Sequence, residues 1–279
     1  LTGGFVVCGV SAWFLLRRRD VEAHKRALSM TMWLLLILTP LQAWIGDEHG
    51  LNTLEHQPEK IAAMEGNWET QSNVPLLLFA LPDRDLQANR AEIGIPNGAS
   101  LILRHDADGV IPGLKEIPVE EQQPVWIVFY SFRVMVALGV LMIAFAIAGL
   151  VLRRGGRLYT SRWFLHGLQG MSLAPFVAVL AGWFVTEIGR SPWLVYGVLS
   201  YADAVTPSLS GGMVLATLIG YIAVYAVIFW AGIYYLFKVV RQGLGDLRGD
   251  EEVHDADRPM RPMSASHVPF DGTTVSSRS

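Results

Sequence analysis

The chain alternates long apolar runs with polar connections. Five runs approach or exceed the roughly 20 apolar residues that a helix needs to cross a membrane. They cover residues 1–16, 28–46, 126–152, 163–188 and 212–240. The pattern predicts an all-α fold, a polytopic transmembrane helix bundle with five spans. Because the first run is short and starts at Leu1, we expect it to be the remainder of a longer span.

The overall composition agrees with this interpretation. Of the 279 residues, 52% are hydrophobic and only 17% are charged, whereas an average soluble domain has about 25% charged residues. The formal net charge of −3 offers no basic surface, so no nucleic acid partner is expected. The single cysteine, Cys8, excludes an internal disulfide framework and a metal site built from several cysteines.

Lysine and arginine residues concentrate on one side of the predicted bundle. This side holds the turns after the first and third spans and the polar tail, with clusters at 17–19 and 153–154. The positive-inside rule assigns it to the cytoplasm. The regions expected are two spans in 1–46, an extracytoplasmic loop in 47–125, three spans in 126–240 and a tail in 241–279. The tail contains too few apolar residues to order itself, so we expect it to be disordered and cytoplasmic.

Few ionisable side chains fall inside the predicted spans. Arg133 lies about two turns into the third span, and Glu187 and Arg190 lie at the end of the fourth. A charge at the bilayer centre costs about 3 kcal/mol, so such residues usually face the bundle interior and mark function. Glu187 and Arg190 share a helix face with Trp183. This group could ligate a metal, relay protons or hold an anion, and spacing alone does not choose.

Met135 lies two residues after Arg133 in the third span. A methionine in a span is most often a packing residue, but a thioether can also be an axial haem ligand when it is paired with histidine. None of the seven histidines lies deep in a span. If Met135 binds haem, the histidine partner must come from outside this sequence.

A short segment of the long loop combines polar groups that could meet a substrate. Pro58 suits the first turn of a helix that would carry Lys60 and Glu65 directly after Gln57. Gln57 and Lys60 can point the same way, and Glu65 follows a little over one turn beyond Lys60. The same spacing fits an ordinary solvated helix, and the spacing leaves both interpretations open.

Three motifs together resemble the C-terminal part of subunit I of the cytochrome bd-type quinol oxidases. They are QPEKIAAME at 57–65 followed by WET at 68–70, FRVM at 132–135, and AGWFVTEIGRSPW at 181–193. The resemblance covers residues 1 to about 245 and fits the short quinol-loop type. It implies a nine-span subunit of which this chain holds the last five. One departure is Ser191, where the family pattern has Gln.

The resemblance implies a quinol site in the loop. Gln57, Lys60 and Glu65 match the family's quinol-binding residues, and Lys60 and Glu65 also match the residues that act on the substrate. The implied activity is that of a quinol:oxygen oxidoreductase, a terminal respiratory oxidase that oxidises quinol at the outer face and reduces oxygen to water. It would contribute to the proton gradient without pumping.

The resemblance also implies haem cofactors. The family carries a low-spin haem b, a high-spin haem b, and haem d or a second haem b. Met135 matches the iron ligand of the low-spin haem b, and Arg133 matches a residue that steadies it. Glu187 matches the iron ligand of the high-spin haem b, and Trp183 and Arg190 match residues that line the same region.

The implied partners are quinol, oxygen, membrane lipid, subunit II of the oxidase and a small single-span subunit. The implied location is the bacterial inner membrane, with several spans. Because the histidine partner of Met135 would lie upstream of Leu1, the chain alone is expected to be inactive.

Two alternatives from other functional classes remain open at this point. The chain could be an ion or solute transporter or channel subunit, with Arg133 and Glu187 on an ion path, or a non-catalytic membrane scaffold. A transporter would predict broken or repeated spans, and the sequence shows no inverted repeat. Haem bands in the visible spectrum would separate the oxidase from both alternatives.

Overall fold

The computed structural model describes residues 1–206 and 208–256, with side chains described as far as residue 242. The chain divides into two compact units, Leu1–Ala216 and Thr217–Ser279, and each is described by itself.

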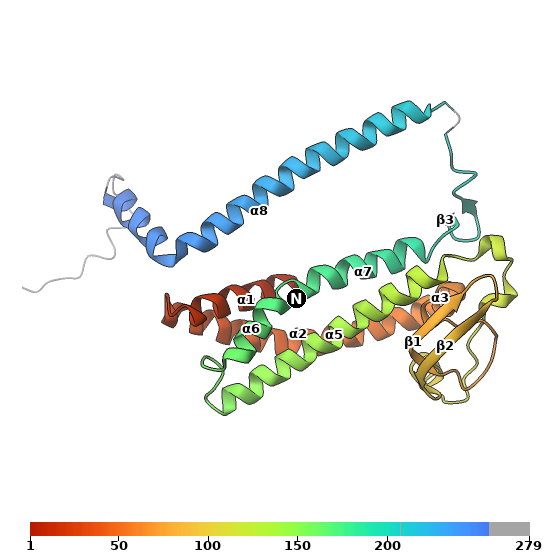
Figure 1. Cartoon of the computed structure of the whole chain (residues 1–279), viewed down its shortest axis with the longest axis horizontal. Helices are drawn as coiled ribbons and strands as arrows, with labels where there is room; N and C mark the ends of the chain where they lie inside the picture. Colours follow the sequence, from red (N-terminus) through yellow and green to blue (C-terminus); the bar gives the residue numbers. More distant parts are fainter. Residues whose placement is uncertain (207, 257–279) are drawn as a thin grey trace, which may run out of the picture. The chain divides into compact units, whose positions relative to one another are not determined.

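The first unit is built on a bundle of apolar helices (Figure 1). They are α1 (Thr2–Leu16), α2 (Val21–His56), α5 (Val125–Arg154), α6 (Arg162–Met171) and α7 (Ala174–Ile188). Helix α2 packs on α1 and α5, α1 packs on α6, and α5 packs on α7. Phe5, Leu28 and Phe164 are fully buried where α1, α2 and α6 meet, and they form the centre of the largest core cluster.

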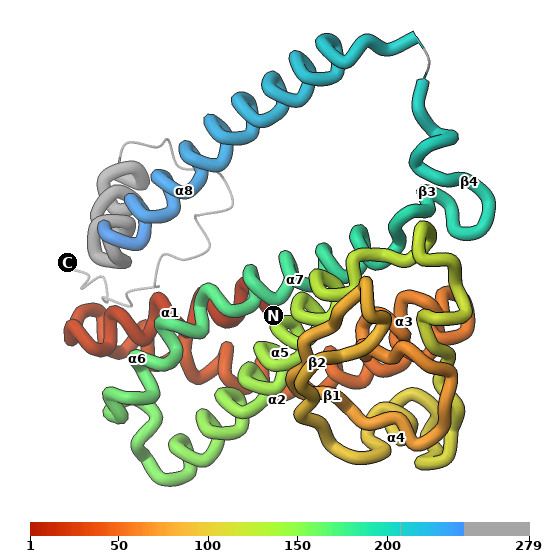
Figure 2. Tube along the Cα trace, turned by 45° about the vertical axis from the view of Figure 1, so that its right-hand side comes forward, coloured from red at the N-terminus to blue at the C-terminus, as the bar shows by residue number. Residues whose placement is uncertain are grey.

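The long loop folds into small elements that gather at one end of this bundle (Figure 2). They are α3 (Pro58–Glu65), β1 (Leu76–Asp83), β2 (Ala88–Ile95), α4 (Gly98–Arg104) and the 3-10 turns η1 (Leu114–Glu116) and η2 (Val119–Glu121). Strands β1 and β2 form an antiparallel hairpin in which Leu76 lies opposite Ile95 and Asp83 opposite Ala88. The expectation of a helical stretch after Gln57 is confirmed by α3. A second short hairpin, β3 (Trp193–Val195) with β4 (Leu199–Ser200), lies outside the predicted loop.

The predicted span count needs a small correction. Among the described residues, four segments are long and apolar enough to cross a membrane: Val21–His56, Val125–Arg154, Arg162–Ile188 and Gly211–Gln242. The first predicted span is α1, whose 15 residues are fewer than a crossing needs. The fourth predicted span is divided into α6 and α7. Pro175 stands in the first turn of α7, where its missing N–H is tolerated, whereas in a continuous helix its ring would clash with the carbonyl of Met171.

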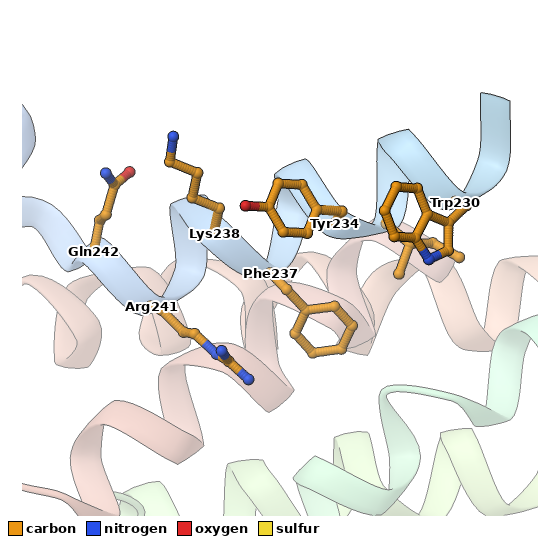
Figure 3. Close-up of a pocket in the computed structure, with 7 residues that line it drawn as sticks. Trp230, Tyr234, Phe237, Lys238, Arg241 and Gln242 are labelled. Atoms are coloured by element: carbon orange, nitrogen blue, oxygen red, sulfur yellow. The ribbon is translucent and has the colours of Figure 1, made fainter. Parts of the chain in front are cut away.

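Helix α8 (Gly211–Ala256) carries the last span and continues beyond it. The expectation of disorder from residue 241 is therefore wrong for 241–256, while 257–279 lie outside the described residues. Near residue 240 the side chains of the helix change from aromatic to basic. Trp230 and Tyr234 stack with their ring centres 5.9 Å apart, and Lys238 and Arg241 follow them along the helix. Figure 3 shows Tyr234 and Lys238 on one side of the helix and Arg241 on the other. Such a transition is typical of a membrane–water interface.

We predict that Gly9→Ala destabilises the bundle. A Cβ atom at Gly9 would lie 2.6 Å from Ser172 Cβ and 3.2 Å from the carbonyl oxygen of Leu168, so α1 and α6 could not keep their close approach. The free energy of unfolding should fall by about 1–3 kcal/mol, as for other overpacked cores. Thermal unfolding of the purified chain in detergent measures this change.

The matched control is Gly3→Ala on the same helix. No heavy atom would lie within 4 Å of a Cβ there, so this variant should be neutral or slightly stabilised by helix propensity. Equal melting temperatures of the two variants would contradict the close packing of α1 on α6.

Candidate functional site

Helix α3 is a short loop helix that is anchored to two spans. Pro58 occupies its first turn, and Gly66, with φ of 66°, ends it in the left-handed conformation that glycine adopts without strain. Its buried residues pack against residues from the start of α5 and the end of α7. The cluster includes Ile61, Ala62, Ala63, Met64, Val125, Val128 and Val185. The polar residues of α3 are therefore held at fixed positions against both spans.

Glu65, the last residue of α3, forms a buried ion pair with Arg133 of α5. The distance from Arg133 Nη2 to Glu65 Oε2 is 2.9 Å, and the two side chains are only 14% and 5% exposed. Arg133 also donates from Nε to the carbonyl oxygen of Leu77 and from Nη1 to that of Met64, both at 2.6 Å. Its guanidinium carbon lies 4.3 Å from the centre of the Phe129 ring. One arginine thus connects α5 with the end of α3 and with β1.

The Glu65 carboxyl is adapted to hold a proton. Its burial disfavours the ionised form and raises the pKa of Glu65 above its usual range. The Arg133 charge and hydrogen bond act in the opposite direction and offset the burial only in part. The result is a carboxyl group that takes up a proton more readily than one in water.

Lys60 belongs to a second polar group, at the end of α7. A Cβ atom on Gly189 would lie 3.2 Å from Lys60 Cγ, so the lysine stem passes directly over this glycine. Burial lowers the pKa of Lys60, the positive charge of Arg190 lowers it further, and Glu187 opposes both effects. Glu187 and Arg190 form an ion pair with a distance of 3.0 Å between Oε1 and Nη2.

The structure thus divides the predicted residues into three places. Glu65 lies with Arg133, and Lys60 lies beside Glu187 and Arg190. Met135 lies apart from both groups, with its sulfur against Gly182 of α7, where an added Cβ would be 2.9 Å away.

Two other predicted residues have less defined surroundings. Gln57 is half-buried at the N-terminal end of α3. Trp183 is 56% exposed, and its ring neighbour is Phe184 at 5.4 Å.

The residues of α5 and α7 fit the haem ligands that the family resemblance implies. The Met135 thioether is only half-buried, and its sulfur packs closely on Gly182, where a larger residue would displace it. The Glu187 side chain is 46% exposed, so its carboxylate is accessible. Arg190 Nε is buried with no acceptor in the described part of the chain, which suits a donor to an anionic group such as a propionate. In the same part, no group of three or more His, Cys, Asp or Glu side chains could hold a free metal ion.

Sequence reasoning missed Asn89 and Gln123 near these groups, and it gave Trp68 only as part of a motif. Trp68 Nε1 donates to Asn89 Oδ1 at 2.8 Å, and Asn89 Nδ2 donates to the carbonyl oxygen of Gly66 at 2.9 Å, so β2 supports the end of α3 beside Glu65. Gln123 donates from Nε2 to the carbonyl oxygen of Gly189 at 3.5 Å. The signal that the sequence offered for Gln123 was a pair of adjacent glutamines, 122–123, shortly before an apolar span.

Glu59 and Tyr196 form another pair that the sequence did not indicate. Glu59 of α3 lies close enough to Tyr196, in the turn after β3, for each to shift the pKa of the other. Burial raises the pKa of Glu59, and burial together with Glu59 raises the pKa of Tyr196 to about 12.

Comparisons with known proteins agree with this arrangement. Residues 1–244 match the family model described as cytochrome bd terminal oxidase subunit I. The chain is 31% identical to cytochrome bd ubiquinol oxidase subunit 1 of Bacillus subtilis (strain 168), with 87% of this chain and 54% of that protein covered. It is 32% identical to a putative cytochrome bd menaquinol oxidase subunit I of the same organism, with 87% and 55% covered. It is 25% identical to cytochrome bd-II ubiquinol oxidase subunit 1 of Escherichia coli (strain K12), with 90% and 62% covered.

A solved structure supports the same relationship. The bd oxidase from Geobacillus thermodenitrificans superposes with a TM-score of 0.76 at 30% identity, covering 87% of this chain and 55% of that one. This chain spans little more than half the length of the relatives that it matches. The family match covers nearly all of the chain, and we conclude that the chain belongs to the cytochrome bd terminal oxidase subunit I family.

Proposed function

We propose that this chain is the quinol-oxidising, haem-ligating part of subunit I of a cytochrome bd-type terminal respiratory oxidase. The observation that carries this proposal is the buried ion pair of Glu65 with Arg133 of α5, since Glu65 belongs to the same short helix as Lys60. Family membership favours the oxidase over the transporter, channel and scaffold alternatives. The named relatives include a ubiquinol and a putative menaquinol oxidase, so we propose the substrate as a quinol of either class.

The positions of Lys60 and Glu65 fit the two ends of a quinol ring. Five residues on a helix correspond to a rotation of about 140° between their side chains. Lys60 accordingly lies against the end of α7, while Glu65 lies against α5. A quinol carries its two hydroxyl groups on opposite sides of the ring, so a headgroup between the two spans could meet one residue at each end.

In the proposed reaction, quinol is oxidised to quinone by the loss of an electron pair and of two hydroxyl protons, one of which passes to Glu65 and the other to water at the outer face. Lys60 donates a hydrogen bond to one ring oxygen and orients the headgroup, with Gln57 at the start of the same helix. Glu65 accepts a hydroxyl proton, for which its raised pKa is suited. While Glu65 is ionised, its ion pair with Arg133 holds the carboxylate in place. Haem, when bound, supplies electron transfer and the reduction of oxygen to water.

The proposed haem ligands are Met135 for the low-spin haem b and Glu187 for the high-spin haem b. Arg133, Trp183 and Arg190 would line these cofactors, with haem d or a second haem b as the third group. Subunit II and a small single-span subunit are the proposed protein partners. The proposed location is the bacterial inner membrane, with the loop outside and the tail inside, so that protons from quinol are released outside.

We predict that Glu65→Gln in the full-length oxidase lowers quinol oxidation at least tenfold while haem content stays near normal. The amide keeps the shape of the side chain but cannot accept the proton. In the unchanged enzyme, kcat/KM should rise with pH through the raised pKa of Glu65, because the ionised form is the base. This rise should lie above the usual glutamate value of about 4.3 and should be absent from the variant.

The matched control is Glu69→Gln. Glu69 is an exposed residue of the same loop, paired with Lys115 on the surface at 2.7 Å. This variant should oxidise quinol at the normal rate. If both variants behave like the unchanged enzyme, Glu65 is not the proton acceptor.

We predict that Met135→Leu removes the low-spin haem signal from the visible spectrum of the oxidase or converts it to high-spin. Leucine preserves apolar volume, so the packing change alone should cost less than about 1.5 kcal/mol. Met142→Leu on the same helix α5, at a position that is 6% exposed, is the control and should leave all haem bands intact. Glu187→Gln should disturb the high-spin haem only. Normal spectra in Met135→Leu and Glu187→Gln would contradict both ligand assignments.

We predict that a cysteine replacing Asp85 in the loop is labelled only from outside, and one replacing Arg19 only from the cytoplasm. Both positions are exposed, and the single natural cysteine, Cys8, is buried and should give little background. Membrane-impermeant maleimide applied to intact cells and to inverted vesicles makes the measurement. Labelling of the loop position from the cytoplasmic side alone would reverse the proposed topology.

A further inference from the structure

Gln123 presents an unpaired acceptor close to the proposed quinol site. Its side chain lies between η2 and α5 and is 2% exposed. The amide nitrogen faces the carbonyl oxygen of Gly189, which can only accept a hydrogen bond. This contact orients the amide and leaves Oε1 as the side-chain polar atom that still needs a hydrogen-bond partner. Within residues 1–206 and 208–242, Oε1 has no hydrogen-bond partner although it is buried.

Gln123 and Lys60 approach the same residue from different elements. The amide nitrogen of Gln123 contacts the carbonyl oxygen of Gly189. The stem of Lys60 passes the Cα atom of the same glycine, with Cγ 3.2 Å from the position that a Cβ would take. A buried polar atom destabilises a protein unless it forms a hydrogen bond with another group, such as one on a ligand. Here the atom belongs to a side chain that contacts the same glycine as Lys60, the residue proposed to bind the substrate oxygen.

The two side chains offer complementary hydrogen-bonding groups. The Lys60 ammonium can only donate, whereas Gln123 Oε1 can only accept. A hydroxyl group can satisfy both at once, because it accepts through its lone pairs and donates through its hydrogen. A quinone oxygen can accept from Lys60 but has no hydrogen for Gln123. The arrangement therefore distinguishes the reduced headgroup from the oxidised one.

We propose that Gln123 is a further quinol-binding residue, whose Oε1 accepts a hydrogen bond from a quinol hydroxyl and makes the site prefer quinol to quinone. This inference rests on the proposed function, since it requires the quinol headgroup to lie at Lys60. It gives the site a means of releasing its product, because oxidation removes the hydrogen bond that Gln123 receives.

The neighbouring Gln122 provides a matched control within the chain. It is 3% exposed and its Oε1 is also buried and unpaired in the described region. Its amide nitrogen, however, donates to the carbonyl oxygens of Leu114 and Ile117, at 2.9 and 3.1 Å, within the loop. Gln122 therefore has the same chemistry and burial, but its partners belong to the loop and not to the end of α7.

The test compares Gln123→Leu with the unchanged full-length oxidase in detergent, using a soluble quinol and its matching quinone. The KM for quinol should rise about tenfold, the size expected for one lost hydrogen bond. The inhibition constant of the quinone should stay within about twofold, because quinone makes no bond to Gln123 Oε1. Gln122→Leu should leave the ratio of the two constants unchanged, and the haem spectrum should be normal in both variants.

Three outcomes would overturn the inference. They are an unchanged KM in Gln123→Leu, an equal rise of both constants, which would indicate a general structural role, or the same change of ratio in Gln122→Leu. If Gln123→Leu does not assemble, Gln123→Asn shortens the side chain by one methylene and keeps its polarity. The ratio should then move in the same direction, and an unchanged ratio in Gln123→Asn contradicts the proposal.

The proposed function has its own readout in this experiment. Lys60→Ala should impair the binding of both quinol and quinone, because Lys60 donates to an oxygen that both forms carry. If Lys60→Ala is normal, the quinol site does not lie at Lys60 and the proposed function fails. If Lys60→Ala is impaired while Gln123→Leu is normal, only the inference on Gln123 fails.

Discussion

The buried pair of Arg133 and Glu65 is the interaction on which the arrangement of the loop depends. Removing two charges from water is costly, and a buried pair is stable only when its remaining donors and acceptors are satisfied. Arg133 meets this requirement by donating to the Glu65 carboxylate and to the carbonyls of Met64 and Leu77. Those partners come from the end of α3 and from β1, so the guanidinium can be satisfied only if both elements take these positions against α5. A short helix that would otherwise be a mobile part of a long connection is thereby fixed to a membrane span.

Fixing α3 at its end also positions the rest of the helix. With Glu65 held against α5, the helical rotation turns Lys60 toward the end of α7, where Gly189 leaves space for its stem. The apolar side of α3 contributes Ile61 and Ala62, which are 1% and 0% exposed, to a cluster with residues of both spans. Glu65 and Lys60 are thus separated on one helix because each contacts a different span. Both groups are desolvated for the same reason, which moves the pKa of Glu65 upward and that of Lys60 downward.

Much of this could be predicted from local sequence, and the rest could not for physical reasons. Apolar runs predicted the spans, and Pro58 predicted the start of α3, because hydrophobicity and proline geometry act over a few residues. The break between α6 and α7 was missed because residues 172–173 are no more polar than their surroundings, and only Pro175 indicated it. The pairing of Glu65 with Arg133 spans 68 positions and leaves no periodic signal. The family resemblance predicted a role for each residue, but only the fold shows that they contact each other.

The polar groups of the bundle lie where the cost of burying charge can be offset. Arg133 stands about two turns into α5, Glu187 stands in the last turn of α7, and Arg190 follows two residues after α7 ends, all at the end that the loop covers. A charge at the bilayer centre costs about 3 kcal/mol, and it costs less near the interface, where backbone carbonyls of a loop can be brought to it. The loop supplies those carbonyls to Arg133 and excludes water from Glu65 at the same time. The proposed uptake of a proton by Glu65 depends on this cover. The long loop is therefore a physical requirement of the site, since the helices alone could neither satisfy Arg133 nor desolvate Glu65.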